Sequence, residues 1–453
     1  MRAADFKTEI RELFRLAAPL AAAQAGTNLM GLVDVAVLGR LGARELAGSA
    51  LANAIFFAFS VGGMGMVMGV DPLISQAIGA GDRVRARHVL WQGVWLALIV
   101  AGVLTAVLLA ADAALPHIGA QAELVEPASI YLLIRLTSLV PFLLYFVMRA
   151  YLQAQGITRP LLHSMIAANI FNLFGDILFV FGGSALPEWT GPLHAIPAMG
   201  VAGAALATVA CTILQLVWVG VAAFRVEVHG HVDHRWNRPE IGRSFRVGLP
   251  LGLQMGAEVG IFALVGVLAS RLGTLQLAAH QLVITIASFT FTVALGVAAA
   301  GSVRVGHAIG ARSASRTRTA GHVAFAVGAI VMGTSGLMFA VFPRALARLV
   351  TNQENVIAAS LPLMLVAAVF QLSDGIQATG AGVLRGAGDT KWSLYANLFG
   401  HWFIGLPVAL FLGFGMGLGI VGLWWGLCAG LTVVAVLLFL RFERLSRGEI
   451  KPI

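Results

Sequence analysis

Four acidic residues lie inside long apolar stretches of the sequence. They are Asp34, Asp176, Glu258 and Asp374. A carboxylate at the centre of a bilayer costs about 2.5 to 3.5 kcal/mol even on the gentler insertion scales, so each one needs a functional or structural reason to be there. A buried carboxylate can bind and release a proton, or be neutralised by Na⁺ or by an organic cation. The four positions therefore predict cation-binding sites inside a membrane.

Polar side chains accompany these acids at helical spacing. Asn172 precedes Asp176 by four residues and Gln254 precedes Glu258 by four, so each pair shares one helix face. Such stripes also serve as hydrogen-bond contacts between helices, but Asn or Ser would do that at lower cost than four acids. The predicted proton- or cation-binding residues are Asp34, Asn172, Asp176, Glu258 and Asp374, with Na⁺ considered at the last two. The predicted substrate-cleft residues are Thr27, Gln254, Gln281, Gln371 and Phe289.

The composition sets the class of protein. Of 453 residues, 58% are hydrophobic and 11% are charged, whereas soluble domains carry roughly 25% charged residues. A soluble globular enzyme is excluded. Because hydrocarbon leaves no water for free backbone groups, apolar runs of this length predict membrane-spanning helices. Twelve are expected, near residues 13–38, 45–69, 88–112, 126–150, 160–182, 199–224, 244–270, 276–301, 319–342, 355–384, 392–413 and 419–441.

The basic residues predict the orientation. Most of the 30 Lys and Arg residues fall at the two ends of the chain and in alternate connections. Since Lys and Arg are retained on the cytoplasmic side, both termini are expected in the cytoplasm. The net charge of +9 is thus explained by the membrane, and no nucleic-acid partner is expected. The N-terminal residues show no cleavage site of a signal peptide.

The sequence contains an internal repeat. Pro19 and Pro250 stand 231 residues apart, as do Gly79 and Gly310. The prediction is an all-α membrane protein with an N-terminal six-helix bundle, residues 1–226, and a C-terminal one, residues 241–453. An even number of helices per half relates the two by a pseudo-two-fold axis along the membrane normal. The cytoplasmic linker, residues 227–240, reads as a solvated loop, and its three His residues give a metal site little weight.

Arg135 is the one cation predicted inside a span. It falls near the outer side of the fourth span, so we favour an arginine that reaches out to the interface over a partner for an acid. Cys211 and Cys428 both lie in apolar runs, which excludes a disulfide framework or a metal cluster built on cysteine.

At this point several motifs resemble one known family. VDVAVLGRLG around Asp34, DPLISQAIGAGD from Asp71, NLFGD ending at Asp176, SVRVGHAIGA from Ser302 and FQLSDGIQATGAGVLRGAGDT from Phe370 are similar to segments of the multidrug and toxic compound extrusion (MATE) transporters, NorM-like branch. Their order and spacing cover nearly the whole chain.

The resemblance implies two six-helix bundles and export of amphipathic, mostly cationic compounds by H⁺ or Na⁺ antiport through alternating access. It assigns Asp34, Asn172 and Asp176 to a proton site and Glu258 and Asp374 to a cation site. Some family Na⁺ sites recruit a Tyr, but Phe370 stands one turn before Asp374, which favours H⁺. We expect a monomer in the cytoplasmic (inner) membrane that acts on small organic cations. We expect no enzyme activity and no cofactor besides the coupling ion.

Three alternatives remain open. A lipid-linked flippase of the same superfamily would be expected to show clusters of intramembrane Arg, and only Arg135 is predicted there. A major-facilitator transporter also has twelve spans, but its acidic loop motif has only a partial imitation here. An intramembrane protease would use the string Gly333 to Gly336 with Ser335 and His401, and such strings are common in helices rich in Gly and Ala.

Overall fold

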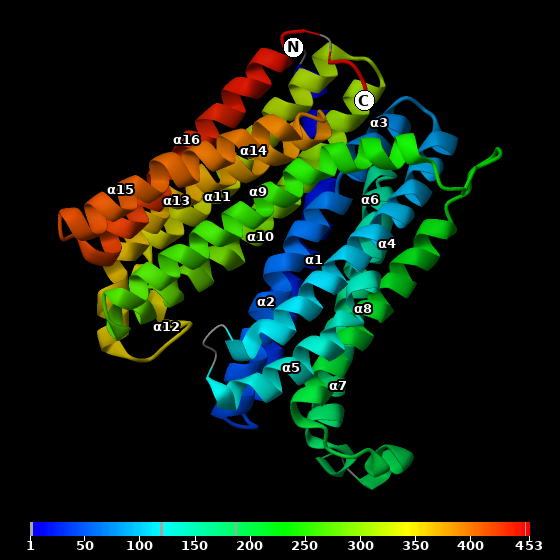
Figure 1. The fold of residues 1–453 in the computed structure, drawn as a ribbon. Coiled ribbons are helices and arrows are strands. Elements are labelled where there is room, and N and C mark those ends of the chain that lie inside the picture. The colour runs from blue at the N-terminus through cyan, green and yellow to red at the C-terminus, as the bar shows by residue number, and fades with distance from the viewer. Residues whose placement is uncertain (1–2, 118–120, 186–187, 449) are drawn as a thin grey trace. The chain divides into compact units, whose positions relative to one another are not determined.

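The computed structural model describes residues 3–117, 121–185, 188–448 and 450–453, and every regular element in this part of the chain is a helix (Figure 1). The N-terminal helices are α1 (Ala3–Leu38), α2 (Ala43–Val67), α3 (Val70–Gly79), α4 (Arg83–Ala114), α5 (Ala122–Leu136), α6 (Leu139–Ala154), α7 (Arg159–Phe181) and α8 (Gly200–Phe224). They are followed by α9 (Arg238–Arg271), α10 (Thr274–Gly310), α11 (Ala314–Val341), α12 (Pro343–Arg348), α13 (Glu354–Gly386), α14 (Thr390–Leu398), α15 (Leu406–Leu410) and α16 (Gly419–Leu445).

These helices confirm the predicted all-α membrane class. Within the described residues, 11 helices are long and apolar enough to cross a membrane, and the bent pair α5 and α6 makes a twelfth span. The helices α2 and α3 form one span, and α14 and α15 form another together with two π-helical turns, η4 (Phe399–Gly405) and η5 (Phe411–Gly415). The count agrees with the twelve expected spans.

Two side-chain hydroxyls bond to backbone carbonyls at the bend between α5 and α6. The two helices meet at 45°. At the break, Thr137 Oγ1 donates to the carbonyl of Ile134 (2.7 Å) and Ser138 Oγ donates to that of Arg135 (2.6 Å). Each of these carbonyls also accepts a hydrogen bond from a backbone amide, that of Thr137 (3.1 Å) and that of Ser138 (2.9 Å), respectively. Ser and Thr hydroxyls that bond back to the preceding turn in this way often accompany a bend in a helix.

The chain divides into two compact units. The N-terminal unit comprises Ala25–Val70 and Arg87–Gly248, while the C-terminal unit comprises Leu249–Ile453, Asp71–Ala86 and the start of the chain as far as Gln24. The C-terminal unit thus contains the first part of α1 and nearly all of α3, and the N-terminal unit contains the first turns of α9. The sequence boundary at residues 227–240 marks the repeat, whereas the contacts group these segments differently.

The crossing of α3 and α10 within the C-terminal unit follows the sequence repeat. A Cβ atom on Gly79 would overlap the backbone of His307, and one on Gly310 would overlap the backbone of Gln76. Gln76 and His307 are 231 residues apart, as are the two glycines, so the repeat exchanges one contact for the other. Only glycine allows two backbones to approach so closely.

Two ion pairs stabilise the same part of the C-terminal unit. Glu9 of α1 accepts two hydrogen bonds from the Arg304 guanidinium of α10, at 2.7 and 2.6 Å. Asp71 of α3 lies 3.6 Å from Arg385 of α13. These pairs and the glycine crossing hold the start of α1 on α10, and α3 from Asp71 onward on α10 and α13.

The linker between the two repeats is held against α4 within the N-terminal unit. Gln92 donates to the carbonyl of Arg235 (2.9 Å) and accepts from the amide of Asn237 (2.9 Å), and Trp95 donates to the carbonyl of His234 (3.1 Å). The linker is therefore largely exposed, as expected of a solvated loop, and is also hydrogen-bonded to α4.

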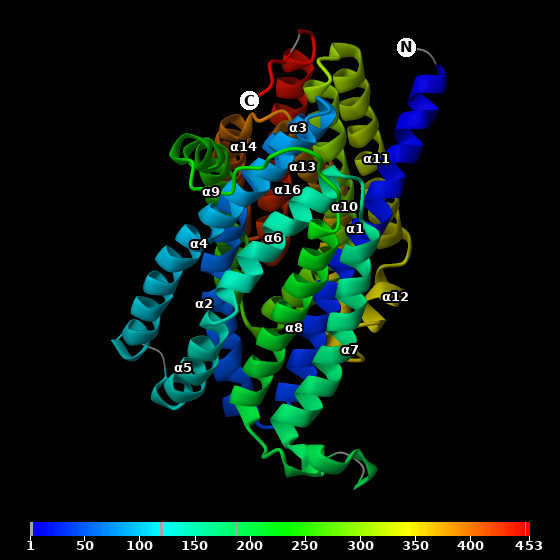
Figure 2. The ribbon, with the colours of Figure 1, turned by 90° about the vertical axis from the view of Figure 1, so that its right-hand side faces the viewer.

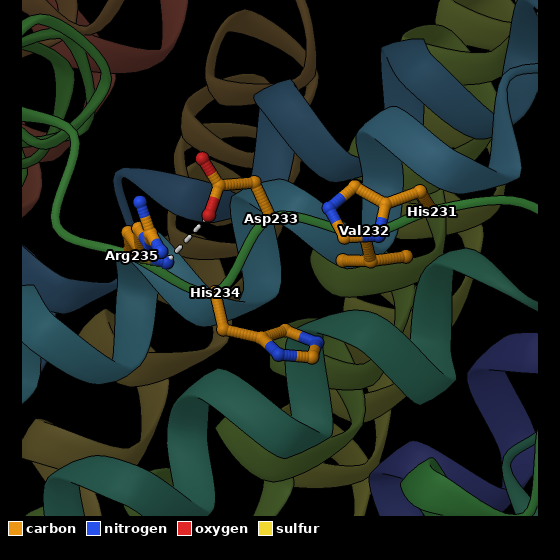
Figure 3. Close-up of a pocket in the computed structure, with 5 residues that line it drawn as sticks. All are labelled: His231, Val232, Asp233, His234 and Arg235. Carbon is orange, nitrogen blue, oxygen red and sulfur yellow. Dashed lines mark hydrogen bonds between the residues drawn. The ribbon is translucent and has the colours of Figure 1, made fainter.

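The side chains of this linker do not form a metal-binding site in the described residues. Figure 3 shows His231 and His234 on either side of Asp233, which accepts a hydrogen bond from the backbone amide of Arg235. These residues line a pocket of about 380 Å³. Among the described residues, no group of three or more His, Cys, Asp or Glu is placed to hold a metal ion.

Candidate functional site

The first acidic cluster lies in the N-terminal unit, between α1 and α7. Asn172 and Asp176 are one turn apart on α7 and both are fully buried. Asn172 Nδ2 donates to Oδ1 of Asp34 on α1, at 2.8 Å. The three residues predicted to form the proton site are therefore brought together by two helices that are far apart in the sequence.

The Asp176 carboxylate is poorly compensated in this cluster. Neither of its oxygens has a hydrogen-bond partner among the described residues, and it interacts electrostatically with the Asp34 carboxylate. Two carboxylates in one buried site cannot both remain charged without a proton or another cation between them. The arrangement therefore favours occupation by a cation.

Two further residues near this cluster were missed by the sequence reasoning. Tyr131 of α5 is buried and interacts electrostatically with Asp34 and Asp176. Thr208 of α8 is also buried, and its hydroxyl donates to the carbonyl of Ala204 at 2.9 Å. Tyr131 is one turn before Arg135, so it shares that residue's helix face. This spacing is the only signal in the sequence that marks it.

Arg135 lies on α5 in the N-terminal unit, and its side chain is half-buried. Its guanidinium carbon is 4.4 Å from the centroid of the buried Phe56 ring, and its Nε atom is buried. Because α5 begins at Ala122, Arg135 is roughly 20 Å along the span. The predicted later start of the helix placed it nearer the outer surface.

The second acidic cluster lies in the C-terminal unit. Glu258 of α9 accepts hydrogen bonds from Asn397 Nδ2 of α14 (3.3 Å) and from Gln377 Nε2 of α13 (3.5 Å). The buried Asp374, one turn before Gln377 on α13, interacts electrostatically with Glu258. The predicted pair of acids is thus brought together here, and Asn397 and Gln377 complete the cluster.

Amide oxygens add to the acceptors of the C-terminal unit. Four buried side-chain oxygens have no hydrogen-bond partner in the described chain. They belong to Gln254, Gln371, Gln377 and Asn397. Carboxylate and amide oxygens are the ligands that hard cations prefer. The donor set of this unit therefore fits Na⁺ as well as a proton.

The predicted cleft residues fall into two groups. Thr27, Gln281 and Phe289 are exposed, whereas Gln254 and Gln371 are buried. Gln371 donates to the Thr290 hydroxyl at 2.6 Å, which ties it to α10. In this structure the exposed residues can meet a substrate directly, and the two buried glutamines belong to the interior near the second acidic cluster.

Phe370, one turn before Asp374, is also buried. Phe370 packs between Trp424 and Phe262, with ring centroids 5.5 and 6.2 Å away, respectively. It supplies no hydroxyl to Asp374, because its side chain is an all-carbon ring. The oxygen ligands of the C-terminal unit come from amides and carboxylates instead.

Comparison with known families shows one clear match. The MatE family model matches residues 19–178 and again residues 250–411, so each predicted repeat matches the same family model. The repeat seen in the sequence is therefore the repeat of the family.

Curated relatives cover almost the whole chain. The probable multidrug resistance protein NorM of Deinococcus radiodurans is 34% identical over 97% of this chain and 96% of its own length. The protein of the same name from Rhizobium meliloti is 33% identical over 98% and 95%.

Solved structures share the fold. A MATE transporter in the straight conformation has a TM-score of 0.86 at 22% identity, covering 97% of this chain and 96% of its own. The eukaryotic MATE transporter AtDTX14 has a TM-score of 0.82 at 21% identity, covering 98% of both chains.

Transporters of this kind are multi-pass membrane proteins and not enzymes. The alternative that the chain is an intramembrane protease is therefore excluded. The helical membrane fold, the twofold match to one family model and the full-length relatives lead to the same result. The chain belongs to the MATE family, as a NorM-type multidrug efflux transporter.

Proposed function

We propose that this transporter exports amphipathic, mostly cationic compounds in exchange for a coupling cation that binds its buried acids. The observation that carries the proposal is the presence of one acidic cluster in each compact unit, around Asp34 and Asp176 in the first and around Glu258 and Asp374 in the second. A cationic drug and a small cation that compete for one carboxylate cannot both be bound, and this competition couples their movements.

The proton is the coupling ion that we favour. In the N-terminal unit Asp176 has no hydrogen-bond partner among described residues, and Asp34 has an amide partner in Asn172. A proton shared by the two carboxyl groups would remove their mutual repulsion without needing a shell of oxygen ligands. Alternating access of the two clusters to opposite sides of the membrane would then move protons one way and drug the other.

Na⁺ is the second candidate for the C-terminal unit. The buried amide oxygens of Gln377 and Asn397 lie in the cluster that holds Glu258 and Asp374, and those oxygens have no other partner in the described chain. Such a set supplies the hard oxygen ligands that a sodium ion needs. This unit could therefore bind either ion.

We further propose a monomer in the cytoplasmic membrane with both termini in the cytoplasm, as the distribution of Lys and Arg indicates. A lipid-linked flippase fits the charges less well. The acids outnumber Arg135 in the N-terminal cluster, and an anionic lipid phosphate would be repelled by them.

The coupling ion can be tested in everted membrane vesicles. With ethidium as the substrate, an imposed proton gradient alone should drive uptake into the vesicles, and an imposed Na⁺ gradient alone should drive much less. If a Na⁺ gradient drives uptake while the pH gradient is collapsed, the coupling ion is Na⁺ and not the proton. Vesicles that transport ethidium under neither gradient would contradict the proposal as a whole.

A further inference from the structure

Arg135 is a cation inside a membrane-spanning pair of helices, and its guanidinium lies over an aromatic ring and forms no ion pair with any acid in the described residues. Its side chain makes no hydrogen bond and no ion pair with any residue that the structure describes. An unpaired arginine at this depth is costly, so it marks a functional site by default. The question is which group the guanidinium binds.

The position of the guanidinium is fixed by the helices around it. It lies over the ring of Phe56 on α2, a side chain that is only 3% exposed. The helix α5 packs closely on α2, since a Cβ atom on Gly48 would reach to 2.5 Å from Cγ of Pro127. Figure 2 shows α2 and α5 with α8 in the same group of helices. The arginine is therefore held in place by packing, not by a salt bridge.

The acids of the first cluster are near enough to act on Arg135 electrostatically. Arg135 attracts the Asp34 carboxylate, yet neither Asp34 nor Asp176 lies within ion-pair distance of it. A purely structural counter-ion would be expected to pair directly with one of these acids. Instead the cluster presents a separate cation and a separate pair of anions.

Such an arrangement is complementary to a dipolar molecule. A guanidinium has five N–H donors in a planar fork that matches a carboxylate, and it keeps its charge at any physiological pH. A monocation would gain only from the acids and would be repelled by Arg135. A compound with both an amine and a carboxylate would gain at both ends.

We propose that Arg135 binds the carboxylate of zwitterionic substrates, whose amine faces Asp34 and Asp176. This inference rests on the proposed function and names a substrate class for the N-terminal cluster. Arg135 would then set the preference of the transporter for compounds that carry both charges over compounds that carry a positive charge alone.

A matched pair of compounds isolates the carboxylate. We would compare a fluoroquinolone that carries an amine and a carboxylate with the ethyl ester of the same molecule, which keeps only the amine. Uptake into everted vesicles under a proton gradient gives kcat/KM for each compound, and binding to the purified protein gives each Kd. The wild type should prefer the acid to its ester.

The variant Arg135→Gln should lower kcat/KM for the acid by roughly ten- to a hundredfold, the value of a hydrogen-bonded charge pair. It should leave the ester unchanged or improve it, because a repulsive charge is gone. Arg135→Lys keeps the charge but loses the planar fork, so it should retain part of the preference. The control is Arg149→Gln, since Arg149 also lies over a ring, that of Phe146 at 5.4 Å; it should leave the ratio of acid to ester at the wild-type value.

Three results would overturn the inference. These are an unchanged ratio of acid to ester in Arg135→Gln, an equal loss for both compounds with unaltered Kd values, or the same shift of the ratio in Arg149→Gln. If Arg135→Gln fails to fold, Arg135→Lys and the Kd values decide instead. Failure of the proposed function would look different, because the wild type would then export neither compound under any gradient.

Discussion

Asp176→Asn is expected to abolish coupled export by this transporter. The amide has the shape of the carboxyl group but cannot exchange a proton or neutralise a cation. The residue is fully buried and interacts with Asp34 across α1 and α7, so its loss leaves a single carboxyl group in a site that holds two. We expect ethidium uptake into everted vesicles to fall at least about tenfold, which corresponds to a loss of about 1.4 kcal/mol or more in the binding of the coupling cation.

Asp34→Asn should have an effect of the same size, because both acids belong to one cluster. The matched control is Asp112→Asn. Asp112 also lies in a membrane-spanning helix, α4, where it accepts a hydrogen bond from Ser129 (3.1 Å) away from the cluster. Its replacement should leave uptake close to the wild-type rate. Normal transport by Asp176→Asn, at normal protein levels in the membrane, would show that the N-terminal cluster is not the coupling site.

Glu258→Gln and Asp374→Asn are expected to disable the C-terminal unit to a similar extent. Glu258 is the common acceptor for Asn397 and Gln377, so a Gln at this position places an amide N–H group against other amide N–H donors. Asp374 is buried beside it. Transport should therefore fall at least about tenfold in each variant, and any stabilisation of the purified protein by NaCl over KCl should disappear.

The control for these two variants lies in the same helix as Asp374. Glu354, at the start of α13, forms an exposed ion pair with Arg348 at 2.7 Å. Exposed pairs contribute about 0 to 1 kcal/mol, so Glu354→Gln should leave both transport and stability near wild type. A wild-type rate in both Glu258→Gln and Asp374→Asn would remove the second cluster from the mechanism.

The four intramembrane acids could be predicted from the sequence, because a carboxylate is costly wherever it lies inside a membrane span. Asn172 with Asp176 and Gln254 with Glu258 were also predictable, since residues four apart share one face of a helix. The pairing of Asp34 with Asn172, by contrast, joins α1 to α7. Periodicity within a helix holds no information about which helices meet, and the family resemblance supplied that pairing.

Asn397 and Arg135 show what the sequence could not provide. Asn397 is on a helix without an acid, so nothing marked it as a partner of Glu258 until α9 and α14 were placed together. For Arg135, the predicted helix start near residue 126 differs from the structure, because α5 begins at Ala122 and then bends after Leu136. A shift of one turn in a boundary changes the depth that is inferred for a residue in the span.

The grouping of helices was also beyond the sequence. The repeat correctly indicated two similar halves, and the MatE model matches each of them. It did not indicate that α3 would pack with the C-terminal unit, because that contact depends on glycines such as Gly79 and Gly310 that bring two backbones together. Close helix crossings of this kind depend on three-dimensional geometry, and hydropathy does not report them.

The most direct test of the account is to measure protons released when an organic cation binds to the purified transporter in weakly buffered detergent solution. If drug and proton compete for the same buried carboxyl groups, adding ethidium should acidify the solution around the wild type. The signal should be absent from a variant that combines Asp34→Asn with Asp176→Asn. Ethidium that binds with unchanged affinity to both proteins and releases no protons from either would contradict exchange at these acids.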